Sequence, residues 1–119
     1  MISLIIPSHN SLELLKITLD CLAQQQSISP EDFEVIVAND GSTDGTSEYC
    51  QTYPGLRLVL LDLERGTGNP GYGRNAGIEI ARGELLVFLD AGILLPPDYL
   101  STIKSKYTGM TETLVVHDI

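Results

Sequence analysis

Two aspartates that follow apolar runs are the side chains of this chain best placed for ligand chemistry. Asp40 comes at the end of FEVIVAND, just before GSTDG, and Asp90 comes at the end of ELLVFLD. A carboxylate at the end of a strand can accept a hydrogen bond from a ligand or bind a hard cation. A capped strand-to-helix turn uses the same residue types, so spacing alone leaves both interpretations open. The calcium-loop pattern fails at Asp40, because its twelfth position is Gln51 and not glutamate.

The segment ERGTGNPGYGRN offers a second kind of site. It contains the spacing Gly66-x-Gly68-x-x-Gly71, which resembles a dinucleotide fingerprint. That fingerprint belongs to the first strand-to-helix turn, which here reads PSHN and has no glycine. A dinucleotide site stays open as the weakest of three interpretations. The other two are a surface loop, or a loop whose glycines let a nucleotide come close while Arg74 supplies a positive charge.

Short apolar runs alternate with helical patterns along the chain. Strands are predicted over 2–7, 33–38, 56–63, 84–90 and 113–117, and helices over 10–26, 46–53 and 98–107. Asn10 and Glu13 resemble a capping box for the first helix, and Gly83 is expected as a left-handed cap after a further helix around Ala76 and Ala81. The alternation predicts an α/β fold: a mostly parallel sheet of about five strands flanked by helices.

Ligands of such sheets bind beyond the carboxyl ends of the strands. We therefore expect four segments to gather there: 8–10, 39–44, the glycine-rich segment and 90–92. They carry most of the polar residues of interest, and this coincidence is the first indication of a binding site.

Composition limits the classes of function. The 119 residues are 43% hydrophobic and 19% charged, which predicts a single globular domain over 1–119. The net charge of -9 argues against a surface that binds nucleic acid by neutralising phosphates. Two cysteines are too few for a disulfide framework and favour a reducing cytoplasm. No apolar stretch is long enough to span a membrane, so we expect a cytoplasmic protein, at most peripheral to a membrane.

Four blocks together carry a family resemblance: LIIPSHN, EVIVANDGSTDGT, GRNAGIEIARGELLVFLDAG and LLPPDYL. In their order and approximate spacing, the chain resembles the N-terminal half of an inverting family 2 glycosyltransferase with a GT-A fold. The blocks cover most of residues 2–100.

The resemblance implies a nucleotide-sugar donor, most commonly a UDP-sugar. It matches Asp40 to the carboxylate that binds uracil, and Asp90 to the first carboxylate of the DxD motif, which meets the ribose and a metal-bound diphosphate. The donor site implied in this way consists of Pro7, His9, Asn10, Asp40, Arg74, Asn75 and Asp90.

The sequence departs from the family pattern in two places. Gly92 stands where the second metal carboxylate would fall, which puts the Mg²⁺ or Mn²⁺ site at Asp90 in doubt. No residue matches the catalytic base, and we expect the glycan or lipid-linked acceptor to be bound by a C-terminal region that this chain lacks. The alternative to a transferase domain is a non-catalytic GT-A-like binding module, paired into a homodimer through an exposed sheet edge.

Overall fold

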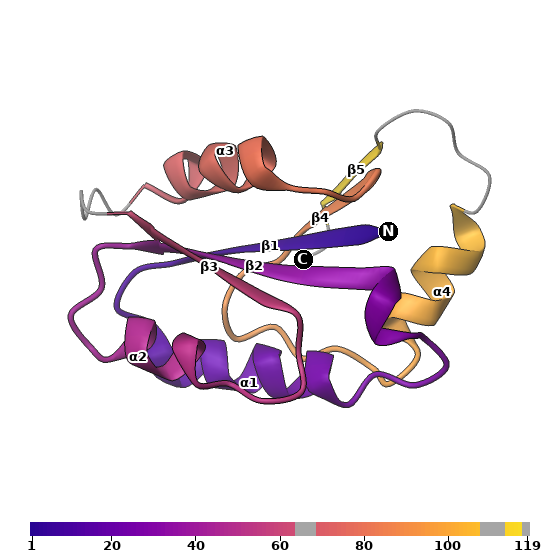
Figure 1. Cartoon of the computed structure of the whole chain (residues 1–119), viewed down its shortest axis with the longest axis horizontal. Helices are drawn as coiled ribbons and strands as arrows, with labels where there is room; N and C mark the ends of the chain where they lie inside the picture. The colour runs from indigo at the N-terminus through magenta and orange to yellow at the C-terminus, as the bar shows by residue number, and fades with distance from the viewer. Residues whose placement is uncertain (64–68, 108–113, 118–119) are drawn as a thin grey trace.

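The structure is a computed structural model that describes residues 1–63, 69–107 and, as backbone only, 114–117. Strands and helices alternate along it (Figure 1). In chain order the elements are β1 (Ile2–Ser8), α1 (Leu12–Ala23), the 3₁₀ turn η1 (Pro30–Asp32), β2 (Phe33–Asp40), α2 (Thr46–Gln51), β3 (Leu58–Leu63), α3 (Pro70–Ile80), β4 (Leu85–Phe88), α4 (Tyr99–Lys106) and β5 (Leu114–His117).

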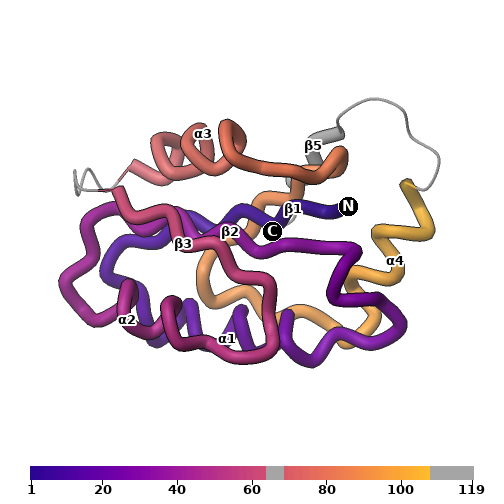
Figure 2. Tube along the Cα trace, viewed as in Figure 1, coloured from indigo at the N-terminus to yellow at the C-terminus, as the bar shows by residue number. Residues whose placement is uncertain are grey.

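The strands form one five-stranded sheet in the order β3-β2-β1-β4-β5. Each neighbouring pair is parallel, which confirms the predicted parallel α/β sheet. The register pairs Ser8 at the end of β1 with Asn39 near the end of β2. The loops after these two strands therefore leave the sheet side by side at its carboxyl edge (Figure 2).

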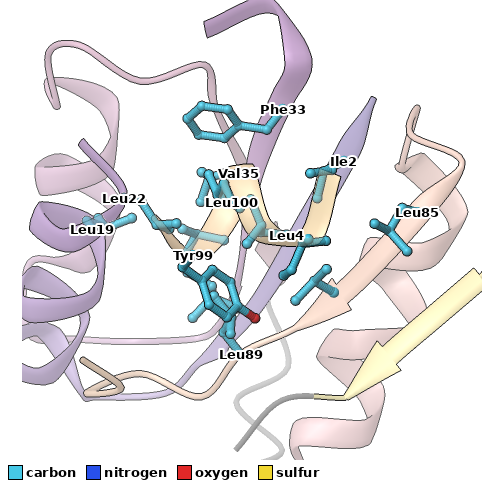
Figure 3. Packing of buried hydrophobic residues seen from close by; sticks show 14 of the residues in the cluster. Ile2, Leu4, Leu19, Leu22, Phe33, Val35, Leu85, Leu89, Tyr99 and Leu100 are labelled. Carbon is cyan, nitrogen blue, oxygen red and sulfur yellow. The ribbon is translucent and has the colours of Figure 1, made fainter. Parts of the chain in front are cut away.

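Helices cover both faces of the sheet. The helix α3 lies on one face, and α1 and α2 lie on the other (Figure 1). Side chains alternate between the faces along each strand, as the two-residue period of a strand requires. The larger core lies on the side of α1 and α4 and includes Leu4, Val35 and Leu89, together with Leu19 and Leu100 (Figure 3).

The smaller core lies on the opposite face of the sheet. It contains Ile5, Ile36 and Phe88, with Val59 and Ala81 packed against them. In α3, Gly77 comes so close to β1 that an added Cβ would lie 2.6 Å from Cγ2 of Ile5. Glycine at this position lets α3 pack directly against the central strand.

The capping box predicted at Asn10 is wrong. The first helix begins at Leu12, and Ser11 occupies its cap without a side-chain hydrogen bond. Asn10 instead has a φ of 49° and accepts a hydrogen bond from the backbone N–H of Thr43, 2.8 Å away. The partner of Asn10 lies in the next loop, which a pattern within one helix cannot reveal.

Two predictions around α3 are also wrong. This helix begins at Pro70, so the second half of the glycine-rich segment is helical and not a loop. It ends at Ile80 with an extended cap at Ala81, and Gly83 is not a left-handed cap. Gly83 is required for another reason: an added Cβ would lie 2.4 Å from the carbonyl oxygen of Met1.

The remaining boundaries agree with the predicted ones to within two residues, except for the first helix, which ends at Ala23 and not near Gln26. None of the helices in the described ranges is long and apolar enough to cross a membrane.

Candidate functional site

The loops that follow β1 and β2 are joined by hydrogen bonds at the carboxyl edge of the sheet. The Nδ1 atom of His9 lies 2.7 Å from the carbonyl oxygen of Asp40. The backbone N–H of Asn10 donates to Oγ of Ser42 over 3.0 Å, and Asn10 accepts in turn from Thr43. Asparagine tolerates the left-handed backbone that this arrangement needs. The two loops therefore form one wall.

A pocket of about 190 Å³ opens beside this wall. Asp40 lies at its surface and is otherwise buried, with 4% of the residue exposed. Pockets for drug-sized ligands are roughly 300–1,000 Å³, so this one has room for a single heterocycle and not for a whole nucleotide. Its lining residues come from β1, the end of β2 and the start of α3: Pro7, Ser8, His9, Asp40, Asn69, Pro70 and Gly73.

The start of α3 closes the pocket from the other side. Asn69 caps this helix by accepting a hydrogen bond from the N–H of Gly71 over 3.0 Å, and Pro70 occupies the first helical position, where its missing N–H is not needed. A Cβ at Gly73 would lie 3.2 Å from Cβ of Pro7 and 3.3 Å from Cβ of Ala38. Glycine therefore avoids crowding where α3 comes close to the two strands.

Asp90 and Arg74 form a second part of the site. Asp90 lies two residues beyond the end of β4 and is exposed, and its Oδ1 atom accepts a hydrogen bond from Nη2 of Arg74 over 3.2 Å. The strand β1 separates β2 from β4, so the ends of these strands are about 10 Å apart by the usual strand spacing. Asp40 and Asp90 thus stand at the same edge of the sheet.

The other predicted residues lie around the pocket to different degrees. Pro7 and His9 line it, whereas Asn10 supports its wall from the adjoining loop. Asn75 is exposed on α3 and is not a lining residue of the pocket. The glycines of the dinucleotide-like spacing, Gly66 and Gly68, lie outside the described residues.

The sequence did not single out two further carboxylates at this edge. Asp62 accepts hydrogen bonds from Asn39 over 3.0 Å and from Ser47 over 3.1 Å. Asp44 accepts from the backbone N–H of Leu12 over 3.0 Å. Asp44 lies within the expected segment 39–44, but its partner Leu12 begins α1, so only the contact between the two loops reveals this role.

The pKa of Asp44 lies below its ordinary value. Partial burial alone would raise this pKa, but hydrogen bonds from the Thr46 hydroxyl and from the backbone N–H groups of Leu12 and Thr46 outweigh that effect. Asp44 therefore stays ionised and holds the two loops together.

The donor set does not fit a divalent cation well. Across the described ranges, no group of three or more His, Cys, Asp or Glu side chains is arranged to hold a metal ion. Asp90 already receives a guanidinium, and Gly92 contributes no side-chain ligand.

Comparison with known proteins assigns the chain to a family. The model of glycosyl transferase family 2 matches residues 3–116. Validoxylamine A glucosyltransferase from Streptomyces hygroscopicus subsp. limoneus is 38% identical over 117 residues, which are 98% of this chain and 26% of that protein. The chain thus spans about a quarter of the length of this relative.

Two solved structures share the fold. S. aureus TarS 1-349 in complex with UDP-GlcNAc superposes with a TM-score of 0.83 at 32% identity, covering 89% of this chain and 30% of that one. The mannosyltransferase PcManGT from Pyrobaculum calidifontis, in complex with GDP-Man and Mn²⁺, superposes with a TM-score of 0.76 at 27% identity, covering 92% and 32%. With its parallel sheet, its pocket at the carboxyl edge and these matches, the chain belongs to glycosyl transferase family 2.

Proposed function

We propose that this chain binds the nucleotide-sugar donor of a glycosyltransferase reaction, with a UDP-sugar as the preferred donor. The observation that carries the proposal is the placement of Asp40 in a pocket the size of one heterocycle, beside His9 and at the carboxyl edge of the sheet. This is the edge where ligands of parallel α/β sheets bind. The complex of the related TarS with UDP-GlcNAc supports the choice of uridine.

Uracil fits the chemistry of the pocket. Its N3–H is a donor, and the Asp40 carboxylate is an acceptor for it, in a charge-assisted hydrogen bond that is stronger than a neutral one. Pro7 and Pro70 supply apolar surface for the faces of the ring. The hydrogen bond from His9 to the carbonyl of Asp40 holds this wall in place before the ligand arrives.

The rest of the donor extends along the edge toward Asp90. We assign the ribose hydroxyls to Asp90, and the neighbourhood of the phosphates to Arg74 and Asn75. Asn10 acts from the adjoining loop and keeps the backbone of the base-binding segment in position.

The transfer itself needs an acceptor hydroxyl and a general base. We propose a glycan or lipid-linked acceptor, bound by the part of the family's catalytic region that lies outside the matched segment, because the chain spans about a quarter of its relative. Among the described carboxylates, Asp90 alone stands where the Mg²⁺ or Mn²⁺ ion implied by the family would be held. The two free cysteines favour a cytoplasmic location for the protein. The association of two copies into a homodimer stays a prediction.

Binding of UDP to Asp40→Asn tests the proposal. The amide at position 40 loses the negative charge, and hydrogen bonds to charged groups contribute about 1.5–3 kcal/mol. We therefore expect isothermal titration calorimetry to show UDP affinity reduced about tenfold to hundredfold, with GDP binding more weakly than UDP to the unchanged protein.

The matched control is Asp98→Asn, which removes the same charge at an exposed position just before α4, away from the pocket. It should leave UDP affinity unchanged. If neither uridine nor UDP binds to the unchanged protein in any buffer, the proposed function is wrong.

A further inference from the structure

In the turn after β4, Gly92 occupies the position of the second metal-binding carboxylate of the family pattern, and the local backbone favours glycine there. Gly92 has a φ of +99°, and an added Cβ would lie 3.1 Å from Cδ2 of Leu14. The N–H of Gly92 donates to Oγ1 of the buried Thr18 over 2.9 Å, and Thr18 in turn donates to the carbonyl of Ile93 over 3.0 Å. The helix α1 therefore fixes this turn in a conformation that a side chain at position 92 would strain.

Asp90 is therefore the one carboxylate of the family's metal-binding motif that this chain retains. The guanidinium of Arg74 already forms an ion pair with it. Mg²⁺ requires about six oxygen ligands in near-octahedral geometry. At Asp90, the guanidinium of Arg74 lies 3.2 Å from the carboxylate and would repel a second positive charge. The described residues offer no cluster of three metal-binding side chains that would compensate for this repulsion.

Arg74 lies between the pocket and Asp90. It follows Gly73, which lines the pocket, and its side chain is 29% exposed. Its Nη2 atom donates to Asp90, whereas its buried Nε–H has no acceptor among the residues that the structure describes. A buried N–H without an acceptor costs free energy, and an oxygen of a bound ligand would relieve that cost.

A guanidinium in this place suits a diphosphate. A nucleotide whose base fills the pocket and whose ribose meets Asp90 carries its phosphates past Arg74. Arginine presents several N–H donors in a planar fork, so it can donate to phosphate oxygens while one nitrogen stays on Asp90.

We propose that Arg74, oriented by Asp90, neutralises the diphosphate of the donor, so that donor binding by this chain needs no divalent cation. The inference rests on the proposed function, since it concerns the same nucleotide-sugar. It departs from the metal site that the family pattern implies at Asp90 and position 92.

Calorimetric titration of the whole chain with UDP and with uridine tests this inference, in EDTA, in Mg²⁺ and in Mn²⁺. We expect the affinity for UDP to agree within about threefold across the three buffers. In EDTA, Arg74→Gln should lose about tenfold or more in affinity for UDP, because charge-assisted bonds to the phosphates are removed, and it should bind uridine almost unchanged.

The control variant is Arg82→Gln. Arg82 is an exposed arginine after the far end of α3, and only its backbone N–H bonds to Glu34. Its replacement removes the same charge and should change neither the affinity for UDP nor the affinity for uridine. Circular dichroism melting of both variants shows that any loss of binding is not a loss of folding. Electron paramagnetic resonance of Mn²⁺ gives a second readout: the protein–UDP complex should hold Mn²⁺ no more tightly than free UDP does.

Two results would overturn the inference while leaving donor binding intact. One is UDP affinity that rises about tenfold or more when Mn²⁺ replaces EDTA. The other is an equal loss of uridine and UDP affinity in Arg74→Gln, which would place the arginine on the base. Failure of uridine and UDP to bind in all three buffers would instead contradict the proposed function and this inference with it.

Discussion

Asn10 and Asp44 join the two loops that form the wall beside the pocket by accepting hydrogen bonds from backbone N–H groups. Asn10 accepts from Thr43 over 2.8 Å, and Asp44 accepts from Leu12 over 3.0 Å and from the Thr46 hydroxyl over 2.6 Å. Each loop thus satisfies N–H groups of the other. A wall that is fixed before the ligand arrives loses less conformational entropy on binding, which favours affinity.

The lowered pKa of Asp44 predicts a pH dependence of stability. Because the folded chain favours the ionised carboxylate, this stabilisation is complete above the ordinary pKa of 3.8 and is lost as the pH falls through the lower pKa of the folded state. We expect urea unfolding to show the free energy of unfolding decreasing from about pH 5 to about pH 3, with a smaller decrease in Asp44→Asn.

Other carboxylates with lowered pKa values, such as Asp32 beside Lys104, contribute to the same pH range in both proteins. The role of Asp44 is therefore read from the difference between Asp44→Asn and the unchanged chain in the slope of the free energy of unfolding against pH. Equal slopes in the variant and in the unchanged chain would contradict the role given to Asp44.

At the scale of elements, the distance between α3 and the sheet is set by glycines. Gly77 faces Ile5 so closely that alanine would place its Cβ 2.6 Å from Cγ2 of the isoleucine. Overpacking of this kind typically costs about 1–3 kcal/mol. We expect Gly77→Ala to lower the free energy of unfolding by about that amount, even though alanine favours a helix, and chemical denaturation measures it.

Displacement of α3 should also open the pocket, since Pro70 and Gly73 belong to the same helix. Glu79→Ala, at an exposed position of α3, is the control and should change stability little. A Gly77→Ala variant as stable as this control would show that α3 does not pack closely enough on β1 to exclude a side chain at position 77.

The sheet could be predicted from the sequence because its signals are local. The runs beginning at Ile2, Phe33 and Leu85 are buried on both faces, and such strands read as continuous apolar segments. The rules for parallel sheets then placed Asp40 and Asp90 on one edge. The start of α3 also had a local signal, since Asn69 followed by Pro70 is a good cap and first helical residue.

The packing of α3, the pocket and the ion pair at Asp90 could not be predicted, because they depend on contacts between distant parts of the chain. The role of Gly83 is set by Met1, and the pocket exists because Gly73 lets α3 approach Pro7. The ion pair between Arg74 and Asp90 joins α3 to the turn after β4. None of these distances follows from the spacing of residue types along the sequence.

At the scale of the whole molecule, the net charge of -9 opposes the approach of an anionic ligand. Long-range repulsion of this kind acts mainly on the association rate, and salt screens it beyond roughly 10 Å at 0.1 M. We expect stopped-flow measurements to show UDP associating faster as ionic strength rises from about 20 to about 200 mM.

Uridine carries no charge and serves as the control, with an association rate that should not change with salt. A rate for UDP that falls as salt increases would indicate an attractive field at the site, as a basic surface patch produces.

The order of the strands has a consequence for the synthesis of this protein on the ribosome. The central strand β1 is made before both of its partners, and one of these, β4, begins only at Leu85, which pairs with Ile2. Until that segment has left the exit tunnel, one side of β1 keeps unpaired backbone groups and a template for wrong pairing. Nascent chains stalled before β4 should therefore be the ones that chaperones hold and that aggregate, whereas chains stalled well after it can complete the sheet.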